Sequence, residues 1–184
     1  MTRIVAGQAG GRRLAVPGGG GTRPTADRVR EALFSSLTSE LGGLAGLGVI
    51  DLYAGSGAVG LEALSRGASR VLLVESDRRA AAVAQANVKA VGLPGATVLV
   101  RPAERLGPNP GAPYDLLFAD PPYALDAAEL RGVLTDLAAN GWLAADATVV
   151  VERGRREDWQ WPDGFAGSRD RRYGDGRLWY GHRD

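Results

Sequence analysis

The residues with the clearest chemical potential are Asp120-Pro121-Pro122-Tyr123, which directly follow the apolar residues Leu117-Phe118-Ala119. Two consecutive prolines remove two backbone N–H groups and stiffen the turn, so its carbonyl groups can act as acceptors. A carboxylate, a rigid carbonyl and an aromatic ring form a pocket for a flat molecule that bears an amino group. Hydrogen bonds from that amino group to Asp120 and to the Pro121 carbonyl would aim the nitrogen lone pair at an electrophilic methyl group, while Tyr123 would stack on the ring.

A second segment, Val49–Leu61, has the pattern of a buried strand that passes into a helix through a glycine-rich turn. Residues Gly55–Gly60 spell G-x-G-x-x-G, and Glu75 follows the apolar residues Val71–Val74. Such a loop presents backbone N–H groups and a helix N-terminus to a ligand, and the later acid accepts ribose hydroxyls. The motif predicts a cofactor that contains adenosine without specifying which one, and glycines of this kind also occur for packing alone.

The chain from residue 49 onward alternates strand and helix patterns. Strands are expected near 49–53, 70–75, 97–101, 114–119 and 147–152, and helices near 57–67, 78–92 and 126–138. The strands are continuous apolar runs, which indicates a mostly parallel α/β sheet with helices on both faces. In such a sheet ligands bind at the carboxyl ends of the strands. The Asp120 turn, the glycine loop and Glu75 should therefore meet at one edge.

The two ends of the chain have a different pattern. Residues 3–16 predict a β-hairpin in which Ile4-Val5 and Leu14-Ala15-Val16 flank a glycine-containing turn, and the glycines of 18–21 then form a connector. At the other end, Asp175-Gly176 lies between β-formers and predicts an antiparallel hairpin.

The composition excludes several classes of site. The chain has no cysteine and one histidine, His182. Disulfides, thiolate-ligated zinc and a cysteine nucleophile are therefore excluded, as is a histidine-based triad or metal cluster, and we expect no metal site. No apolar run approaches the about 18 residues of a membrane span, and the N-terminus lacks the apolar core of a signal peptide. We expect a cytoplasmic protein that makes no membrane contact.

The net charge of +1 conceals an uneven distribution of charge along the chain. Residues 1–30 hold six arginines against one acid and carry +5, whereas residues 31–152 carry −6 and residues 153–184 carry +2. A basic arm on an acidic body predicts a polyanionic partner that approaches one end, since arginine binds phosphate through two N–H groups at once. The candidate contacts are Arg12, Arg13, Arg23, Arg28 and Arg30, of which the last three fall off the apolar stripe of their predicted helix and are free to point at solvent or at a ligand.

These motifs together resemble a known family. Asp-Pro-Pro-Tyr after an apolar strand resembles the signature of nucleic-acid methyltransferases that act on amino groups. With that motif, the chain resembles the bacterial 16S ribosomal RNA guanine-N2 methyltransferases of the RsmD type, through the segments Gly7-x-x-x-Gly11-Arg12-x-Leu14, Arg23-Pro24-Thr25-x-Asp27-Arg28-Val29-Arg30-Glu31, Asp51-x-x-Ala54-Gly55-Ser56-Gly57 and Gly60-Leu61-Glu62-Ala63-Leu64-Ser65-Arg66.

The resemblance implies S-adenosyl-L-methionine as methyl donor and the N2 amine of one guanine in 16S rRNA as acceptor, with the RNA either free or in an assembled small-subunit particle. It also implies a monomer with a Rossmann-like class I methyltransferase fold and a seven-stranded sheet. A hairpin arm and connector over residues 1–22 would precede a methyltransferase domain over residues 23–184. Carried over by position, the residues that bind the methyl donor are Asp51, Ala54, Gly55, Ser56, Gly57, Glu75, Ser76, Ala103, Glu104 and Asp120, and the target-base pocket is formed by Asp120, Pro121, Pro122 and Tyr123.

One position departs from the family pattern. The residue before Ala103 is commonly Asp or Asn in these enzymes, and here it is Pro102, whose side chain offers no hydrogen bond. The adenine contact would therefore come from Glu104 or from the backbone. Guanine as target also has a physical argument, because its N1–H and N2 amino groups are neighbouring donors that suit a carboxylate, whereas adenine would present the lone pair of N1.

Other functions stay open on the sequence alone. A DNA methyltransferase acting on adenine N6 or cytosine N4 would share the central chemistry, although the chain has no room for a separate sequence-reading domain. A nicotinamide- or flavin-dependent oxidoreductase would use the glycine loop but leaves Asp120–Tyr123 unexplained. A non-catalytic RNA-binding module would use the basic arm alone.

Overall fold

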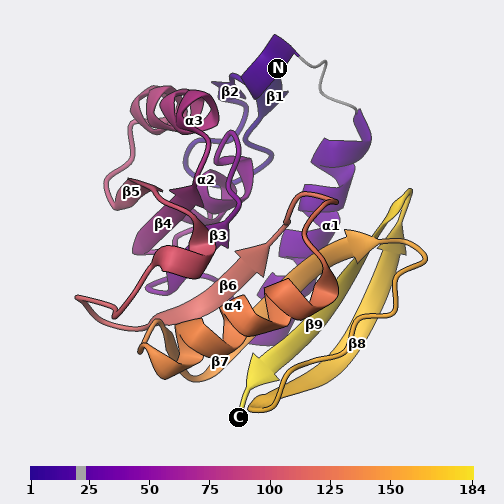
Figure 1. The fold of residues 1–184 in the computed structure, drawn as a ribbon. Coiled ribbons are helices and arrows are strands. Elements are labelled where there is room, and N and C mark those ends of the chain that lie inside the picture. Colours follow the sequence, from indigo (N-terminus) through magenta and orange to yellow (C-terminus); the bar gives the residue numbers. More distant parts are fainter. Residues whose placement is uncertain (20–23) are drawn as a thin grey trace.

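The computed structural model describes residues 1–19 and 24–184 and has a central sheet between two layers of helices (Figure 1). Within this part of the chain the main sheet has seven strands in the order β5-β4-β3-β6-β7-β9-β8. Strands β3 to β7 pair in parallel, and β9 and β8 extend the sheet in the antiparallel sense. The bounds are β3 (Gly48–Leu52), β4 (Arg70–Glu75), β5 (Ala96–Val100), β6 (Tyr114–Ala119), β7 (Leu143–Gly154), β8 (Phe165–Tyr173) and β9 (Gly176–Arg183). The expected sheet and its C-terminal antiparallel hairpin are confirmed.

Apolar side chains alternate between the two faces of the sheet and build a core on each side. On one face, Val49 and Leu116 belong to a core that also includes buried residues of α1, α2, α3 and the N-terminal segment. On the other face, Ile50 and Leu117 share a core with α4 and with the short 3-10 helix η2. The bounds are α1 (Pro24–Leu41), α2 (Ala58–Ser65), α3 (Arg78–Val91), η2 (Ala103–Arg105) and α4 (Ala127–Ala139). Helices on both faces, as the unbroken apolar strands predict, are therefore confirmed.

Local capping residues set where α3 and α4 begin. The Asp77 carboxylate accepts the N–H of Ala80 at 2.8 Å at the start of α3. In α4, Asp126 and Glu129 each accept the other's backbone N–H, which is the reciprocal arrangement of a capping box. Both helices begin within one residue of their predicted starts because these signals lie in the adjacent sequence.

The N-terminal hairpin is shorter than predicted. Only β1 (Thr2–Arg3) and β2 (Arg13–Leu14) pair, in the antiparallel sense. The expectation that Val5 and Ala15 extend the ladder is wrong, because their N–H groups donate elsewhere. Val5 donates to Glu62 at 2.7 Å, and Ala15 donates to Asn87 at 2.8 Å. The N-terminal segment is thus fastened to α2 and α3 rather than built as a long hairpin.

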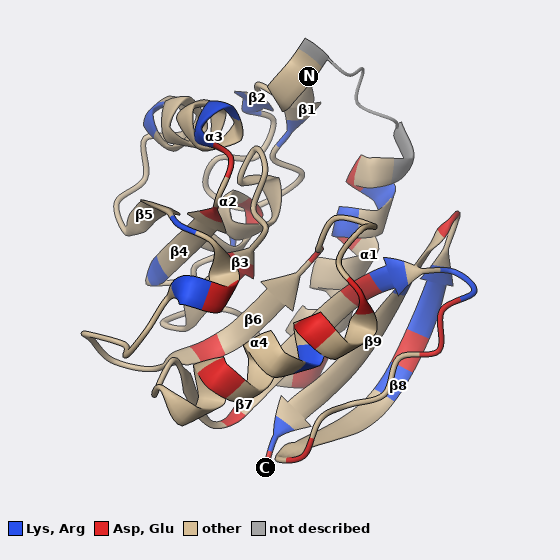
Figure 2. Ribbon diagram, viewed as in Figure 1, with Lys and Arg blue, Asp and Glu red and all other residues tan. Residues whose placement is uncertain are grey.

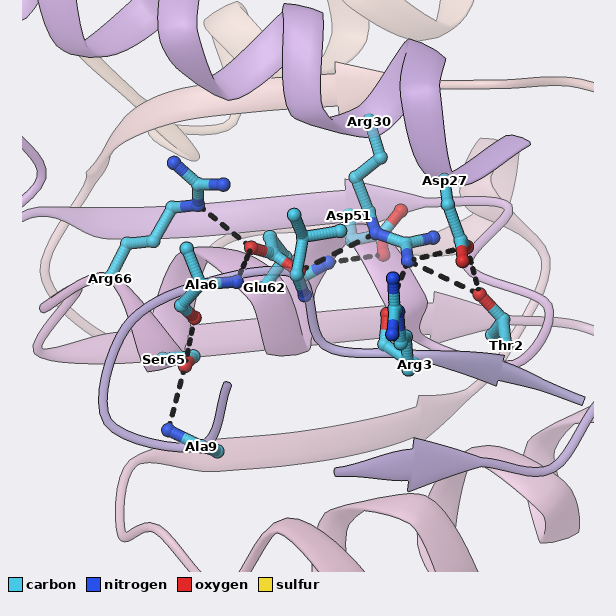
Figure 3. Close-up of polar contacts among 12 residues, drawn as sticks. Thr2, Arg3, Ala6, Ala9, Asp27, Arg30, Asp51, Glu62, Ser65 and Arg66 are labelled. Carbon is cyan, nitrogen blue, oxygen red and sulfur yellow. Dashed lines mark hydrogen bonds and ion pairs between the residues drawn. The ribbon is translucent and has the colours of Figure 1, made fainter. Parts of the chain in front are cut away.

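The strongest of these attachments centres on Glu62, whose side chain is fully buried in α2 (Figure 3). Its carboxylate accepts the N–H groups of Val5 at 2.7 Å and Ala6 at 3.0 Å, and the Nε–H of Arg66 at 2.8 Å. The Nε atom of Arg30 lies 3.5 Å from the same carboxylate. A buried charge is tolerated where hydrogen bonds replace water, and this carboxylate accepts them from Ala6 and Arg66 on Oε1 and from Val5 on Oε2.

Arg30 occupies a position that the sequence analysis did not anticipate. The expectation that it is free to point at solvent or at a ligand is wrong, since only 6% of its surface is exposed. Its Nη2 donates to Thr2 Oγ1 at 3.2 Å, to the Arg3 carbonyl and to Asp27 at 3.0 Å. This guanidinium ties α1 to β1 and to Glu62, so it is committed to the fold and is not a phosphate contact.

Two expectations concern residues outside those described. The predicted boundary at residue 22 and half of the glycine connector, residues 20 and 21, fall there, so the division into arm and domain stays a prediction. The preceding residues Pro17–Gly19 form the short 3-10 helix η1. Among the helices in residues 1–19 and 24–184, none is both long and apolar enough to cross a bilayer.

Replacing the buried carboxylate tests how much the N-terminal attachment stabilises the fold. We expect Glu62→Gln to lower the free energy of unfolding by about 3–5 kcal/mol, because the new NH₂ group faces donors and the buried ion pairs with Arg66 and Arg30 are lost. Glu31→Gln, at an exposed position of α1, should change it by less than about 0.5 kcal/mol. Urea unfolding followed by circular dichroism measures both. Equal free energies of unfolding for the two variants would contradict the stabilising role of the Glu62 carboxylate.

Candidate active site

The register of three parallel strands sets the position of the site. Leu52 of β3 pairs with Val74 of β4 on one side and with Ala119 of β6 on the other. The residues that follow these strands therefore emerge side by side at the carboxyl edge of the sheet. The prediction that the glycine loop, Glu75 and the Asp120 turn come to one edge is confirmed.

Two neighbouring pockets open at this edge, and we call them the larger and the smaller pocket. The larger pocket has a volume of about 570 Å³ and is lined by Tyr53, Val74, Glu75, Ser76, Asp77, Arg101, Pro102, Ala103, Glu104, Asp120, Pro122 and Leu125. The smaller pocket, about 20 Å³, is lined by Asp120, Pro121, Tyr123, Glu152, Arg153, Gly154, Glu157 and Gly176. Asp120 lines both, so this residue lies where the two pockets adjoin.

The glycine loop has structural roles within the protein, and its predicted role toward a cofactor stays a prediction. A Cβ atom on Gly60 would lie 2.3 Å from Leu73 Cδ2, so this glycine allows α2 to pack against β4. Gly57, with φ of 78°, begins α2 in the left-handed region. The N–H of Gly55 donates to Glu75 at 2.8 Å, and that of Gly57 donates to the Ala54 carbonyl at 2.7 Å. The N–H groups of Gly55 and Gly57 are therefore used within the protein and are not free for a ligand.

Glu75 is held by two backbone contacts at the rim of the larger pocket. Its Oε2 accepts the N–H of Gly55, and its Oε1 accepts the N–H of Asp77 at 2.8 Å. Each carboxylate oxygen has two acceptor positions, so one on each oxygen is available to a ligand hydroxyl. The two contacts fix the orientation of the Glu75 carboxylate and leave it able to accept further hydrogen bonds.

Asp51 lies beneath the loop rather than in either pocket. Its side chain is buried, and its Oδ2 accepts the N–H of Gly60 at 2.8 Å. Burial raises the pKa of Asp51 to about 8, with smaller contributions from the charges of Asp120 and Glu75. Ala54, Gly55, Ser56 and Gly57 also do not line the two pockets, so the roles of these five residues toward a cofactor stay predictions.

Three acidic residues line the smaller pocket, namely Asp120, Glu152 and Glu157, of which Glu157 is paired with Arg153. Desolvation by the surrounding protein raises the pKa of Asp120 to about 6, although the residue keeps an open side toward the pockets. Burial and the charge of Asp120 raise the pKa of Glu152 to about 7. Beside them, the Tyr123 side chain is 88% exposed, so its ring can meet a ligand. The Pro122 carbonyl accepts the N–H of Leu125 and is used within the turn.

The remaining arginine candidates lie at the surface. Arg12, Arg13 and Arg28 are exposed, and Arg12 donates to the Ala90 carbonyl at 2.7 Å. Arg23 lies outside the described residues. Basic residues also lie along β8 (Figure 2), where Arg171 and Arg172 are exposed. The role of Arg12, Arg13 and Arg28 as phosphate contacts stays a prediction.

Sequence reasoning missed several residues that line the pockets. Glu152 ends the predicted strand 147–152, and Tyr53 ends the predicted strand 49–53. Their position at the carboxyl ends of strands was the available signal, since ligands of such sheets bind there. Arg153 and Gly176 gave no comparable signal, because their position depends on the pairing of β7 with β9.

The comparisons with known proteins address the family directly. The chain matches the family described as Conserved hypothetical protein 95 over residues 2–182. It is 40% identical to Ribosomal RNA small subunit methyltransferase D of Escherichia coli (strain K12) over 154 residues, which cover 82% of this chain and 73% of that protein. The chain belongs to this methyltransferase family. The resemblance inferred from its motifs is confirmed.

Solved structures agree with the methyltransferase fold. The chain is similar to a putative methyltransferase, yhhF, from Escherichia coli, with a TM-score of 0.84, 33% identity and coverage of 99% of this chain and 97% of that one. A magnesium protoporphyrin IX methyltransferase from Synechocystis PCC 6803, crystallised with bound SAM, has a TM-score of 0.69 at 19% identity over 90% of this chain and 87% of that one. That second likeness concerns the fold alone, and the expected class I methyltransferase fold is confirmed.

The buried carboxyl beneath the loop makes stability depend on pH. A carboxyl whose pKa is raised on folding contributes stability that is complete below the unfolded pKa of 3.8 and is lost as the pH rises through about 8. Asp51→Asn keeps an oxygen acceptor for Gly60 and carries no charge, so its free energy of unfolding should fall less between pH 5 and pH 9. Each pKa unit corresponds to about 1.4 kcal/mol.

Urea unfolding at several pH values measures the difference between wild type and Asp51→Asn. Asp136→Asn, at an exposed position of α4, should follow the wild-type slope. If the Asp51→Asn slope equals that of wild type, Asp51 is not the titrating group.

Proposed function

We propose that this chain transfers a methyl group from S-adenosyl-L-methionine to the exocyclic N2 amine of a guanine in 16S ribosomal RNA. The observation that carries the proposal is the position of Asp120, which lines both the larger and the smaller pocket. A carboxyl group between two pockets can hold an amino group in one next to an electrophile in the other. Membership of the ribosomal RNA small subunit methyltransferase D family supports this choice of substrate. A protein that acts on ribosomal RNA in this way would work in the cytoplasm.

The larger pocket suits an adenosine that carries a cationic group. Glu75, fixed by Gly55 and Asp77, can accept ribose hydroxyls. Ala103 and Glu104 would lie beside the adenine, with Pro102 contributing packing but no side-chain hydrogen bond. The charges of Asp120 and Glu75 help to raise the pKa of Asp51, so a sulfonium cation at this edge would relieve the repulsion among these acids.

Direct transfer requires orientation and electrostatics from the protein. When bound, S-adenosylmethionine supplies an electrophilic methyl group, whose S–C bond breaks as the N–C bond to guanine forms and S-adenosylhomocysteine is left. The amine is a poor nucleophile because its lone pair is delocalised into the ring. The Asp120 carboxylate accepts an N–H of that amine, which favours a localised lone pair, and it can take the proton that the methylated nitrogen releases.

The surroundings of the smaller pocket determine how a base could enter. Its volume of about 20 Å³ has room for little more than one water molecule, so it would receive the polar edge of a base rather than the whole ring. Tyr123 is exposed and would stack on the remainder of the ring. A base in folded RNA must be splayed out of its stack to reach this position.

Replacing Asp120 separates methyl transfer from binding of the methyl donor. We expect Asp120→Asn to lower kcat by about 10²–10⁴-fold, because Asn cannot accept the proton. Binding of S-adenosylhomocysteine, measured by calorimetry, should change by only a few fold. Asp163→Asn, at an exposed position, is the matched control. Methylation by Asp120→Asn at the wild-type rate would overturn the role of Asp120.

The identity of the product tests the proposed substrate. 16S rRNA transcribed in vitro, small subunits reconstituted from it and duplex DNA are each incubated with tritiated methyl donor, and modified nucleosides are identified by mass spectrometry. We expect N2-methylguanosine in RNA. Methylated adenine or cytosine in DNA would instead support the DNA methyltransferase, and no methyl transfer to any substrate would support the non-catalytic RNA-binding module.

The exposed arginines of the N-terminal segment should act on RNA binding alone. Arg12→Gln together with Arg13→Gln should reduce the slope of log affinity against log salt by about 0.7–0.9 for each phosphate that the variant no longer binds. Affinity for S-adenosylhomocysteine should be unchanged. Electrophoretic mobility shift at several salt concentrations measures the slope. An equal fall in both affinities would identify these arginines as structural supports of the larger pocket.

A further inference from the structure

The proposed function leaves Glu152 without a role, although it stands beside Asp120. Val151 of β7 pairs with Ala119 of β6, so the next residues along the two parallel strands are Glu152 and Asp120. Both line the smaller pocket. The pocket therefore presents two carboxyl groups next to each other, from adjacent strands.

The surroundings of Glu152 leave its carboxylate to a ligand. Across residues 1–19 and 24–184, no N–H or O–H group donates a hydrogen bond to the Glu152 carboxylate. Burial and the charge of Asp120 raise its pKa. The neighbouring cation, Arg153, is committed elsewhere: it donates to Glu157 at 2.7 Å and to the Leu125 carbonyl at 3.0 Å. The Glu152 carboxylate therefore has acceptor positions that a ligand entering the smaller pocket can use.

The backbone of β9 leaves room for the Glu152 carboxylate two residues before Leu178, the residue that pairs with Glu152. Gly176 begins β9, and a Cβ atom there would lie 2.8 Å from Oε1 of Glu152. Any larger residue at 176 would push the carboxylate from its place. Glycine at position 176 therefore leaves room for the Glu152 carboxylate at the smaller pocket.

We propose that Glu152 is a specificity-determining residue that accepts the N1–H of the target guanine while Asp120 accepts the adjacent N2 amine. The inference rests on the proposed function and assigns the recognition of the base within the same site. Guanine presents N1–H and N2–H as neighbouring donors, which two adjacent carboxylates match. Adenine and cytosine carry a ring-nitrogen lone pair next to their amino group, and that lone pair would face the Glu152 carboxylate and be repelled.

The raised pKa values of the two carboxyl groups agree with this pairing. Burial disfavours the charge of both groups in the free protein, and the charge of Asp120 further raises the pKa of Glu152. Two N–H groups of a guanine edge would supply donors to both carboxylates at once. Glu152 would then favour guanine by binding it and disfavour the other bases by repulsion.

A substrate analogue tests the assignment with the whole chain. The probe is an RNA fragment that spans the guanosine identified by product mapping, with either guanine or 2-aminopurine at that position. 2-Aminopurine keeps the N2 amine but has a lone pair at N1. Wild type should methylate the 2-aminopurine fragment with a kcat/KM about 10–100-fold lower than the guanine fragment, the range expected for a single base-specific interaction.

Glu152→Gln should reverse this preference in part. The Gln NH₂ group can donate to the N1 lone pair of 2-aminopurine, so the ratio of kcat/KM values should shrink at least about tenfold. Glu152→Asp, which keeps a carboxylate, should retain the preference for guanine at a reduced rate. Glu31→Gln, outside the site, should behave as wild type. Circular dichroism and binding of S-adenosylhomocysteine establish that the variants fold.

The outcomes separate the inference from the proposed function. If wild type forms no N2-methylguanosine in the guanine fragment, the proposed function fails and the inference fails with it. If wild type methylates both fragments equally, or if Glu152→Gln keeps the wild-type ratio, the inference is overturned while the function stands. Should Glu152→Gln fail to fold, the wild-type ratio and the Glu152→Asp ratio still decide the matter.

Discussion

The structure depends on the parallel pairing of β3 with β4 on one side and β6 on the other. Hydrogen bonds along these ladders fix where each strand ends, and hence where Glu75 and Asp120 emerge. A slip of one residue would turn every side chain of a strand to the opposite face and break both cores. The apolar cores thus hold the register, and the register holds the chemical groups at a shared edge.

A buried ion pair makes the N-terminal segment part of the same framework. α2 follows the glycine loop, packs Gly60 against β4 and carries Glu62. The Glu62 carboxylate binds the backbone of residues 5 and 6 and lies beside Arg30 of α1 (Figure 3). The segment expected to be a basic arm for RNA therefore also helps to hold α1 against α2.

The charge at the carboxyl edge explains which ligands this framework favours. Asp51, Asp120 and Glu152 all have raised pKa values, chiefly because burial disfavours their charged forms. A site that gathers acids in this way favours ligands that bring positive charge or N–H donors. The proposed sulfonium cofactor would bring positive charge, and the edge of the proposed guanine substrate would bring N–H donors.

The sequence by itself determined the elements and the edge at which they meet. Helix α3 and strand β6 lie within one residue of their predicted bounds, and the hairpin at Asp175-Gly176 is present, because periodicity, caps and turn residues are encoded in neighbouring positions. Parallel topology then brought Glu75 and Asp120 to one edge without knowledge of any contact. The family followed from motifs that are contiguous in the chain.

Only the tertiary structure decided the partners of individual polar groups. Arg30 and Glu62 are 32 positions apart in the sequence, and nothing in the sequence near either residue predicts that they form an ion pair. The short hairpin has the same cause, since Val5 donates to a carboxylate 57 residues away instead of across a ladder. Glu152 likewise became part of the site only when β7 packed beside β6. Side-chain partners across such distances depend on how the layers pack, and local sequence carries no signal for that.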